Sequence, residues 1–230
     1  MSKINTGCLL CQEELCYNPS APIDVICMCC GKQKKSYVTC ANGHYVCDEC
    51  HRKKILLVVE ELCMVSDLTD PVELALQIFR LPGLNMHGPE YHSIVAAVLV
   101  TAYTNITKDK NAQVIKEAIN RGKDVKGGVC GSHGCCGAAV GVGIAYAIIN
   151  NVIPYSKVER GLANKMTALA LLQISLYGGP RCCKRDAMIA IEVARREFPY
   201  FENKSNSRYI CNQYPDNKEC INEKCPYHPL

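Results

Sequence analysis

The sequence predicts an all-α core domain between a small cysteine-rich N-terminal module and a cysteine-containing C-terminal tail. Two observations indicate the helical core: apolar residues recur there at helical spacing, and no segment alternates for long enough to suggest a strand. A third observation is that paired cysteines crowd the first part of the chain, whereas the last part is polar and rich in turn residues. The expected boundaries are residues 1–51, 52–200 and 201–230.

Composition narrows the class of protein. A chain of 230 residues that is 48% hydrophobic and 21% charged is long enough to bury a core, and its net charge of +4 is too small to argue for nucleic-acid binding. The segment MSKINTGCLLC lacks the apolar stretch of a secretory signal, so we expect a cytoplasmic protein. In that compartment, 18 cysteines indicate metal ligation or thiol chemistry rather than a disulfide framework.

The N-terminal module contains four closely spaced pairs of potential metal ligands. They are Cys8 and Cys11, Cys27 and Cys30, Cys40 and His44, and Cys47 and Cys50. Eight ligands suffice for two tetrahedral zinc ions, and a segment this short needs metal to fold. The spacing resembles the interleaved cross-brace of RING-type zinc fingers, in which the first pair joins the third and the second joins the fourth. We therefore expect a zinc-finger-like module with two zinc ions.

Alternatives remain for this module. Cys16, Cys29 and His51 are substitute ligands, a single four-ligand site is possible, and iron could replace zinc. The simplest interpretation is a metal-stapled fold without chemistry. A second interpretation is recognition of RNA or an acidic partner by nearby basic residues, although a run of charges usually marks only a solvated surface. These basic residues are Lys32, Lys34, Lys35, Arg52, Lys53 and Lys54.

The helices of the core domain are predicted from apolar spacing and start signals. Asp70 followed by proline is typical of an N-cap, and Gly88-Pro89 marks another helix start. The longest weakly polar run, residues 134–149, has 16 residues, fewer than the ~20 needed to cross a membrane. Within it Gly137, Gly141 and Ala145 share one face, where a neighbouring helix is expected to approach closely.

Two predicted helix starts in the core carry adjacent cysteines. Cys135 and Cys136 precede the small-residue helix, and Cys182 and Cys183 begin the last long helix. Unpaired backbone N–H groups and the helix dipole favour the thiolate form at such positions. Cys130 and His133 lie in the glycine-rich loop before the first pair, and Arg181 precedes the second; these residues extend the set.

Together these segments predict an iron–sulfur cluster, most simply of the [4Fe–4S] type. Successive residues at a helix start diverge by about 100°, so we expect Cys130, one of the first pair and one of the second pair to be ligands. Three thiolates would leave one iron open to substrate. Arg181 would stabilise the anionic cluster. The nearest candidates for proton transfer are His87, Glu90, His92 and His133.

Other centres compete with this interpretation. A zinc ion could occupy the same three cysteines together with a histidine. A persulfide or redox thiol pair at Cys182 and Cys183 would need no metal, and basic neighbours would lower the thiol pKa. A disulfide between adjacent cysteines is the least attractive option, because its geometry is strained.

The tail offers a further set of ligands, namely Cys211, Cys220, Cys225 and His228. They could close a third metal site, and the Cys225-Pro226 step is similar to the end of ferredoxin-type cluster motifs. A loose tail is the competing expectation, since chain ends are poorly ordered unless they are tied down.

Several motifs resemble a cysteine-rich prokaryotic domain family of unknown function. They are CANGHYVCDECH, GLNMHGPEYH, GGVCGSHGCCGAAVGVGI, LANKMTALAL and GGPRCCKRDA, and the resemblance covers nearly the whole chain except the tail. It implies a redox or iron–sulfur setting in an anaerobe, with radical-SAM or methyltransferase modules as partners. It also implies that His87, Cys130, Cys136, Cys182 and Cys183 are site residues, but it supplies no activity.

The sequence thus yields two hypotheses of function. The first is an iron–sulfur protein that carries out sulfur transfer, desulfuration or a lyase-type reaction at an open iron, on a small polar or sulfur-containing substrate. The second is a non-catalytic binding module whose zinc-binding part docks RNA or a partner enzyme. Neither hypothesis involves a membrane.

Overall fold

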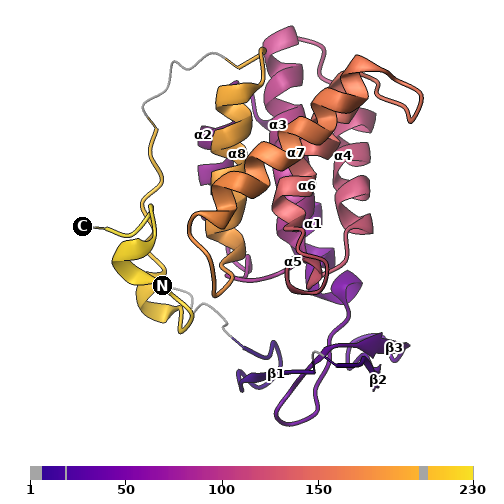
Figure 1. The fold of residues 1–230 in the computed structure, drawn as a ribbon, viewed down its shortest axis with the longest axis vertical. Coiled ribbons are helices and arrows are strands. Elements are labelled where there is room, and N and C mark those ends of the chain that lie inside the picture. The colour runs from indigo at the N-terminus through magenta and orange to yellow at the C-terminus, as the bar shows by residue number, and fades with distance from the viewer. Residues whose placement is uncertain (1–6, 19, 202–206, 230) are drawn as a thin grey trace.

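The computed structural model describes residues 7–18, 20–201 and 207–229. Within these ranges the chain forms a compact N-terminal finger, a bundle of helices and a tail that returns to the bundle (Figure 1). The predicted all-α core with a small N-terminal module is confirmed. No helix of the described residues is long and apolar enough to cross a membrane.

The finger contains two short antiparallel sheets of two strands each. Strand β1 (Leu15–Tyr17) pairs with β4 (Val38–Cys40), and β2 (Ile23–Ile26) pairs with β3 (Gln33–Ser36). Each strand has only three or four residues, too few for an alternating pattern to stand out in the sequence. The strands bring the cysteine-bearing turns together rather than building a core of their own.

Helix α1 (Asp48–Val65) joins the finger to the bundle. It begins directly after Cys47 and contains Cys50, so its first turn carries the last ligand pair of the finger. Its later turns bury Ile55, Leu56 and Val59 in the core of the bundle. The helix therefore runs through the expected boundary at residue 51.

The bundle surrounds a central helix, α3 (Glu90–Thr107), which is buried along most of its length. Helices α1, α2, α4, α6 and α8 all pack against it. The surrounding helices are α2 (Pro71–Ile78), α4 (Ala112–Asp124), the single-turn α5 (Val129–Ser132), α6 (Gly137–Ile149), α7 (Val158–Ser175) and α8 (Cys183–Glu197). The predicted cap of α2 is confirmed, because the backbone N–H of Val72 donates to Asp70 Oδ1 at 2.8 Å.

The small-residue face of α6 packs directly on α3, as the sequence predicts. A Cβ at Gly137 would lie 2.4 Å from the ring of His92, and a Cβ at Gly141 would lie 2.8 Å from the His92 carbonyl oxygen. No side chain fits at either position. The absence of side chains thus sets how close the start of α6 lies to α3, and α6 carries Cys136 at its N-cap.

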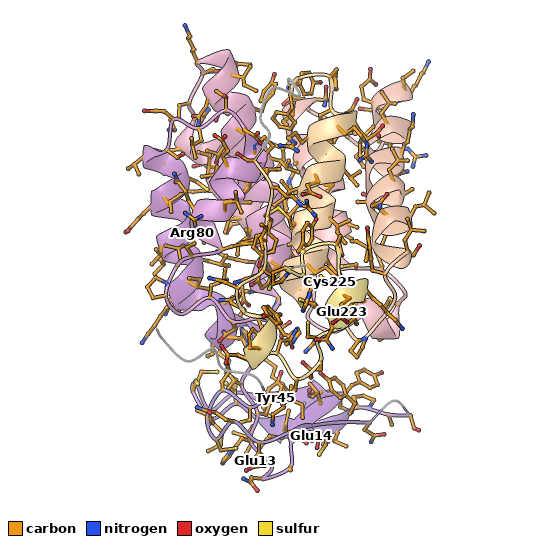
Figure 2. The ribbon with its side chains drawn as sticks, turned by 90° about the vertical axis from the view of Figure 1, so that its left-hand side faces the viewer. Glu13, Glu14, Tyr45, Arg80, Glu223 and Cys225 are labelled. Atoms are coloured by element: carbon orange, nitrogen blue, oxygen red, sulfur yellow. The ribbon has the colours of Figure 1, made fainter. Side chains whose placement is uncertain are left out.

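The tail folds back over the end of the bundle that faces the finger (Figure 2). Its only regular elements are two 3₁₀ turns, η1 (Tyr214–Asp216) and η2 (Asn222–Lys224), in the described residues 207–229. Two buried tyrosines anchor it: Tyr209 packs edge-on against Phe79, and the Tyr227 hydroxyl donates to Glu192 on α8 at 2.7 Å. The described part of the tail is therefore packed on the bundle rather than loose.

Candidate metal centres

The finger brings its eight predicted ligands into two groups. One group is Cys8, Cys11, Cys40 and His44, and the other is Cys27, Cys30, Cys47 and Cys50. In each group the ligand atoms all lie within 4.8 Å of one another. The first pair thus joins the third and the second joins the fourth, which confirms the predicted cross-brace.

Sulfur separations in the finger suit one ion per group. Cys11 Sγ lies 3.7 Å from Cys40 Sγ, and Cys30 Sγ lies 3.9 Å from Cys47 Sγ. A tetrahedral ion with metal–sulfur bonds of about 2.3 Å holds its sulfurs about 3.8 Å apart. The finger can therefore hold two metal ions. The substitute ligands are not used here: Cys16 and Cys29 are exposed, and His51 contacts Glu90 instead.

Backbone donors prepare two finger thiols for metal. Burial alone would raise the pKa of Cys8, but backbone N–H groups of Cys11 and Leu10 outweigh it and bring this pKa to about 6. Burial would also raise the pKa of Cys27, but the backbone N–H groups of Cys47, Cys30 and Cys29 lower it to about 6. Each group thus contains one thiol that is already a thiolate near neutral pH.

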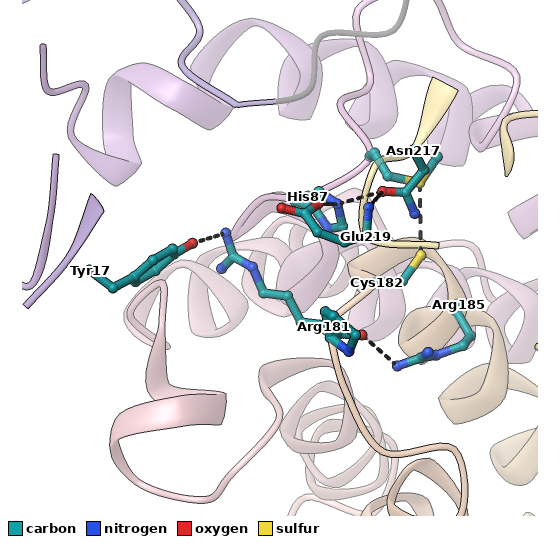
Figure 3. A network of polar contacts seen from close by, with 9 residues as sticks. Tyr17, His87, Arg181, Cys182, Arg185, Asn217 and Glu219 are labelled. Carbon is teal, nitrogen blue, oxygen red and sulfur yellow. Dashed lines mark hydrogen bonds and ion pairs between the residues drawn. The ribbon is translucent and has the colours of Figure 1, made fainter. Parts of the chain in front are cut away.

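Adjacent cysteines at the start of α8 face different surroundings. Cys182 Sγ lies 3.8 Å from the sulfur of Met86, on the side covered by the tail (Figure 3). The Cys183 thiol instead accepts a hydrogen bond from the backbone N–H of Gly88, and the charges of Arg181 and Cys130 act on it. The divergence expected at a helix start therefore separates this pair.

Cys183 belongs to a neighbourhood of thiols from three elements. Its charge acts on Cys136 at the N-cap of α6, and Cys130 of α5 acts on Cys183. Of the cysteines expected to share one centre, Cys130 and Cys136 thus both lie within electrostatic reach of Cys183. Cys130 is exposed, so its side of this neighbourhood opens to solvent.

The expected lowering of the thiol pKa at these helix starts is wrong for the metal-free chain. Burial raises the pKa of Cys136 and of Cys182 to about 12 and that of Cys183 to about 11. Backbone N–H groups and, for Cys183, Arg181 oppose this effect without overcoming it. Desolvation of the thiolate outweighs the helix terminus here, so these thiols need a metal to ionise at neutral pH.

Arg181 lies where the finger, α8 and the tail meet (Figure 3). Its Nη2 donates to the Tyr17 hydroxyl of β1 at 3.1 Å. Burial would lower its pKa, but the charges of Cys183, Tyr17, Cys130 and Glu219 raise it further above its ordinary value. The guanidinium is therefore a permanent positive charge beside the Cys183 neighbourhood. The sequence analysis predicted Arg181 as a site residue but did not predict its hydrogen bond to Tyr17.

His87 is held by the tail. Its Nε2 lies 2.8 Å from Glu219 Oε2 and 3.3 Å from Asn217 Oδ1 (Figure 3). Burial lowers the pKa of His87, and the opposing charge of Glu219 does not restore it. Asn217 and Glu219 are site residues that the sequence analysis missed, because no local pattern links them to a histidine 130 positions earlier.

The other proton-transfer candidates are dispersed. Glu90 is fully buried with His51 Nδ1 3.0 Å from its carboxylate, and His92 Nδ1 lies 3.1 Å from the Val125 carbonyl oxygen. His133 is exposed, and its ring lies 2.7 Å from the hydroxyl of the neighbouring Ser132. The four candidates therefore do not converge on one point.

A cavity beneath the tail collects the remaining predicted ligands. Its lining includes Cys182, Cys211, Cys220, Cys225 and His228, together with the buried cations Lys184 and Arg185. The sequence analysis grouped the tail ligands with one another but not with Cys182. Among the described residues, only the two finger groups bring three or more ligand atoms within 4.8 Å of one another. The core thiols are thus spaced too widely for a single ion.

The fold and these clusters define a cysteine-rich, metal-binding helical protein with a cross-braced finger. Residues 59–228 match the model of a family of unknown function, DUF5714, and the chain belongs to this family. The match includes the tail and omits the finger, which corrects the coverage expected from the sequence motifs. No curated protein and no solved structure matches the chain.

Proposed function

We propose that this protein is an iron–sulfur enzyme whose finger holds two structural zinc ions. Its reaction centre is a [4Fe–4S] cluster on Cys130, Cys136 and Cys183, with one iron left for substrate. Such a cluster supplies a Lewis-acidic iron that can bind a substrate oxygen or hold a sulfide for transfer. The reaction is sulfur transfer or removal, or a lyase-type elimination, on a small polar substrate.

A single observation carries this proposal: Cys183 of α8 interacts electrostatically with Cys136 of α6, with Cys130 of α5 and with Arg181. The three sulfur atoms do not all lie within 4.8 Å of one another, which argues against a single ion and leaves room for a polynuclear cluster. Exposure of Cys130 provides the route by which substrate reaches the centre.

The surrounding side chains have defined roles in this proposal. Arg181, fixed by the Tyr17 hydroxyl, orients an anionic group of the substrate. His87 lies next to the same arginine, and burial lowers its pKa, so its ring is neutral near pH 7 and can accept a proton. Glu219 and Asn217 hold its ring in place. Buried Glu90 and partly buried His51 form a pair that connects α1 to α3.

Anaerobic purification with iron, zinc and labile-sulfide analysis tests the proposal. We expect about two zinc ions from the finger, together with iron and equimolar sulfide. Cys183→Ser should remove the iron of the reaction centre, whereas Cys16→Ser, at an exposed cysteine outside every cluster, should leave all metals in place. Zinc alone, without iron or labile sulfide, would reject the proposal.

One observation favours a second candidate function, the docking of a partner enzyme. The β2–β3 hairpin exposes Ile23 and Ile26 beside Lys34 and Lys35, although a finger with two metal sites needs no such surface. Exposed apolar residues rimmed by charge are typical of protein contacts. A radical-SAM or methyltransferase protein is the partner we propose. The double substitution Ile23→Ser with Ile26→Ser should abolish its capture while leaving the metal content unchanged.

A further inference from the structure

The geometry points to a second iron–sulfur centre, bound by Cys182 of α8 and by Cys211, Cys220 and Cys225 of the tail. We propose that this centre is a [4Fe–4S] cluster with four cysteine ligands and no open iron. It is distinct from the proposed reaction centre, since Cys183 faces the other way. The inference goes beyond the proposed function and does not depend on it.

The first support is the cavity itself. All four thiols line it, and they come from segments far apart in the sequence. Two backbone hydrogen bonds close the tail around it: Cys211 N–H donates to the Tyr227 carbonyl oxygen at 2.7 Å, and Cys225 N–H donates to that of Asn222 at 2.8 Å. The tail thus forms a loop whose cysteines face the start of α8.

Spacing argues against a single ion in this cavity. The same structure that brings the finger ligands within 4.8 Å of one another leaves no three ligands of this cavity within that distance. A zinc ion would require sulfurs about 3.8 Å apart. A cubane cluster, whose four irons each carry one cysteine, needs a wider set of thiols. The tail cavity therefore suits the cluster.

The turn at Cys220 has the geometry of a metal-binding cysteine in this chain. The backbone N–H of Asn222 donates to Cys220 Sγ at 3.3 Å. In the finger, the N–H two residues after Cys8 and after Cys40 donates to the respective sulfur at 3.4 and 3.3 Å. Such N–H donors stabilise a thiolate bound to metal. Cys220 thus accepts the same kind of backbone hydrogen bond as Cys8 and Cys40 of the finger.

A buried cation next to the cavity is the second independent support. Lys184 is 2% exposed, and its ammonium donates to the Phe79 carbonyl oxygen at 3.1 Å and to the side-chain oxygen of Gln213. Among the described residues no carboxylate lies within 4.0 Å of it. Buried charges are normally paired, and an anionic four-thiolate cluster provides the missing negative charge.

The cluster also explains how a tail with so little regular structure holds its shape. Two 3₁₀ turns and two tyrosine anchors leave its loop without a core of its own. Metal ligation supplies that stability, as it does in small metal-bound domains. Because the loop carries Asn217 and Glu219, this saturated cluster fixes the two side chains that hold His87.

Iron counting on the full-length chain, reconstituted anaerobically with ferrous iron and sulfide, tests the inference. Because three thiolates can hold such a cluster, the test removes two ligands at once: the double variant Cys182→Ser with Cys220→Ser should lower the bound iron by about four atoms relative to the wild type. Cys183→Ser should keep these irons, and Cys16→Ser is the matched control. If only the proposed reaction centre is wrong, the wild type binds about four irons, Cys183→Ser keeps them and the double variant loses them.

His228 allows a second experiment, because it is a competing ligand in the same cavity. Its Nδ1 is buried there and has no hydrogen-bond partner. His228→Ala should retain the iron, since the four cysteines already saturate the cluster. Retention of all iron by the double variant Cys182→Ser with Cys220→Ser would overturn the inference, as would loss of iron in His228→Ala or zinc in place of iron in the cavity. Circular dichroism shows whether the double variant has folded; if it has not, Cys211→Ser with Cys225→Ser in the tail replaces it.

Discussion

Cys182 and Cys183 are neighbours in sequence, yet their sulfur atoms lie in different surroundings. The Cys182 sulfur lies 3.8 Å from that of Met86 under the tail, while Cys183 accepts the backbone N–H of Gly88 on the side of Arg181. The two side chains point in different directions at the helix start, and the tail covers only the side on which Cys182 lies. The two thiols therefore have different chemical surroundings. One dipeptide thus connects the tail to the Cys130 and Cys136 side of the bundle.

Substituting one ligand in either group of the finger should remove one metal ion and leave the other in place. Cys11→Ser removes a ligand of the first group and Cys30→Ser a ligand of the second, so each variant should lose about one of two zinc ions. Zinc measured by mass spectrometry on the native protein checks this. Loss of both ions from either variant would show instead that the groups fold as one unit. Cys29→Ser, exposed and outside both groups, is the control.

Gly122→Ala should destabilise the bundle by about 1–3 kcal/mol, because α4 has no room for a side chain there. The added Cβ would lie 2.4 Å from the Cα of Ser93 on α3, and backbone cannot move aside cheaply. Gly161→Ala on α7 is the matched control, since its Cβ meets nothing within 4 Å. Denaturant unfolding should show that this control gains up to about 1 kcal/mol from helix propensity. Equal effects of the two substitutions would contradict the packing argument.

The contribution of His92 to stability should depend on pH. Burial lowers its pKa in the folded protein, so the unfolded chain binds the proton first as the pH falls through its ordinary value of 6.5. The stability that neutral His92 contributes is therefore fully present above pH 6.5 and is lost as the pH falls from 6.5 to the lower pKa of the folded protein. Urea unfolding of the wild type and His92→Gln measures this, and the difference between them should shrink on acidification. A difference that stays constant with pH would contradict a neutral buried His92.

Lys184→Met should shift the reduction potential of the tail cluster to a more negative value. Removing a buried positive charge beside the cluster disfavours the added electron, and a methionine side chain fills a similar space. Redox titration followed by electron paramagnetic resonance measures the shift. Lys165→Met on α7 is the control and should change nothing, because its side chain is exposed and far from the tail in sequence. An unchanged reduction potential in Lys184→Met would show that the charge of this lysine does not act on the cluster.

Local sequence patterns determined much of this protein. The spacing of the finger pairs predicted which ligands combine, because a Cys-x2-Cys turn presents both thiols to one ion. Helical periodicity and the Asp70 cap predicted the bundle, and the small residues of α6 predicted its close contact with α3. These features depend on neighbours a few residues apart, so one sequence is enough to recognise them.

Tertiary structure alone decided the rest. It placed Cys182 of α8 in the same cavity as the tail cysteines, and it brought Glu219 to His87 and Tyr17 to Arg181. It also reversed the expected thiol pKa shifts, since burial depends on which segments cover a helix start. The physical reason is that such contacts arise from long-range packing and desolvation, and neither leaves a periodic trace in the chain.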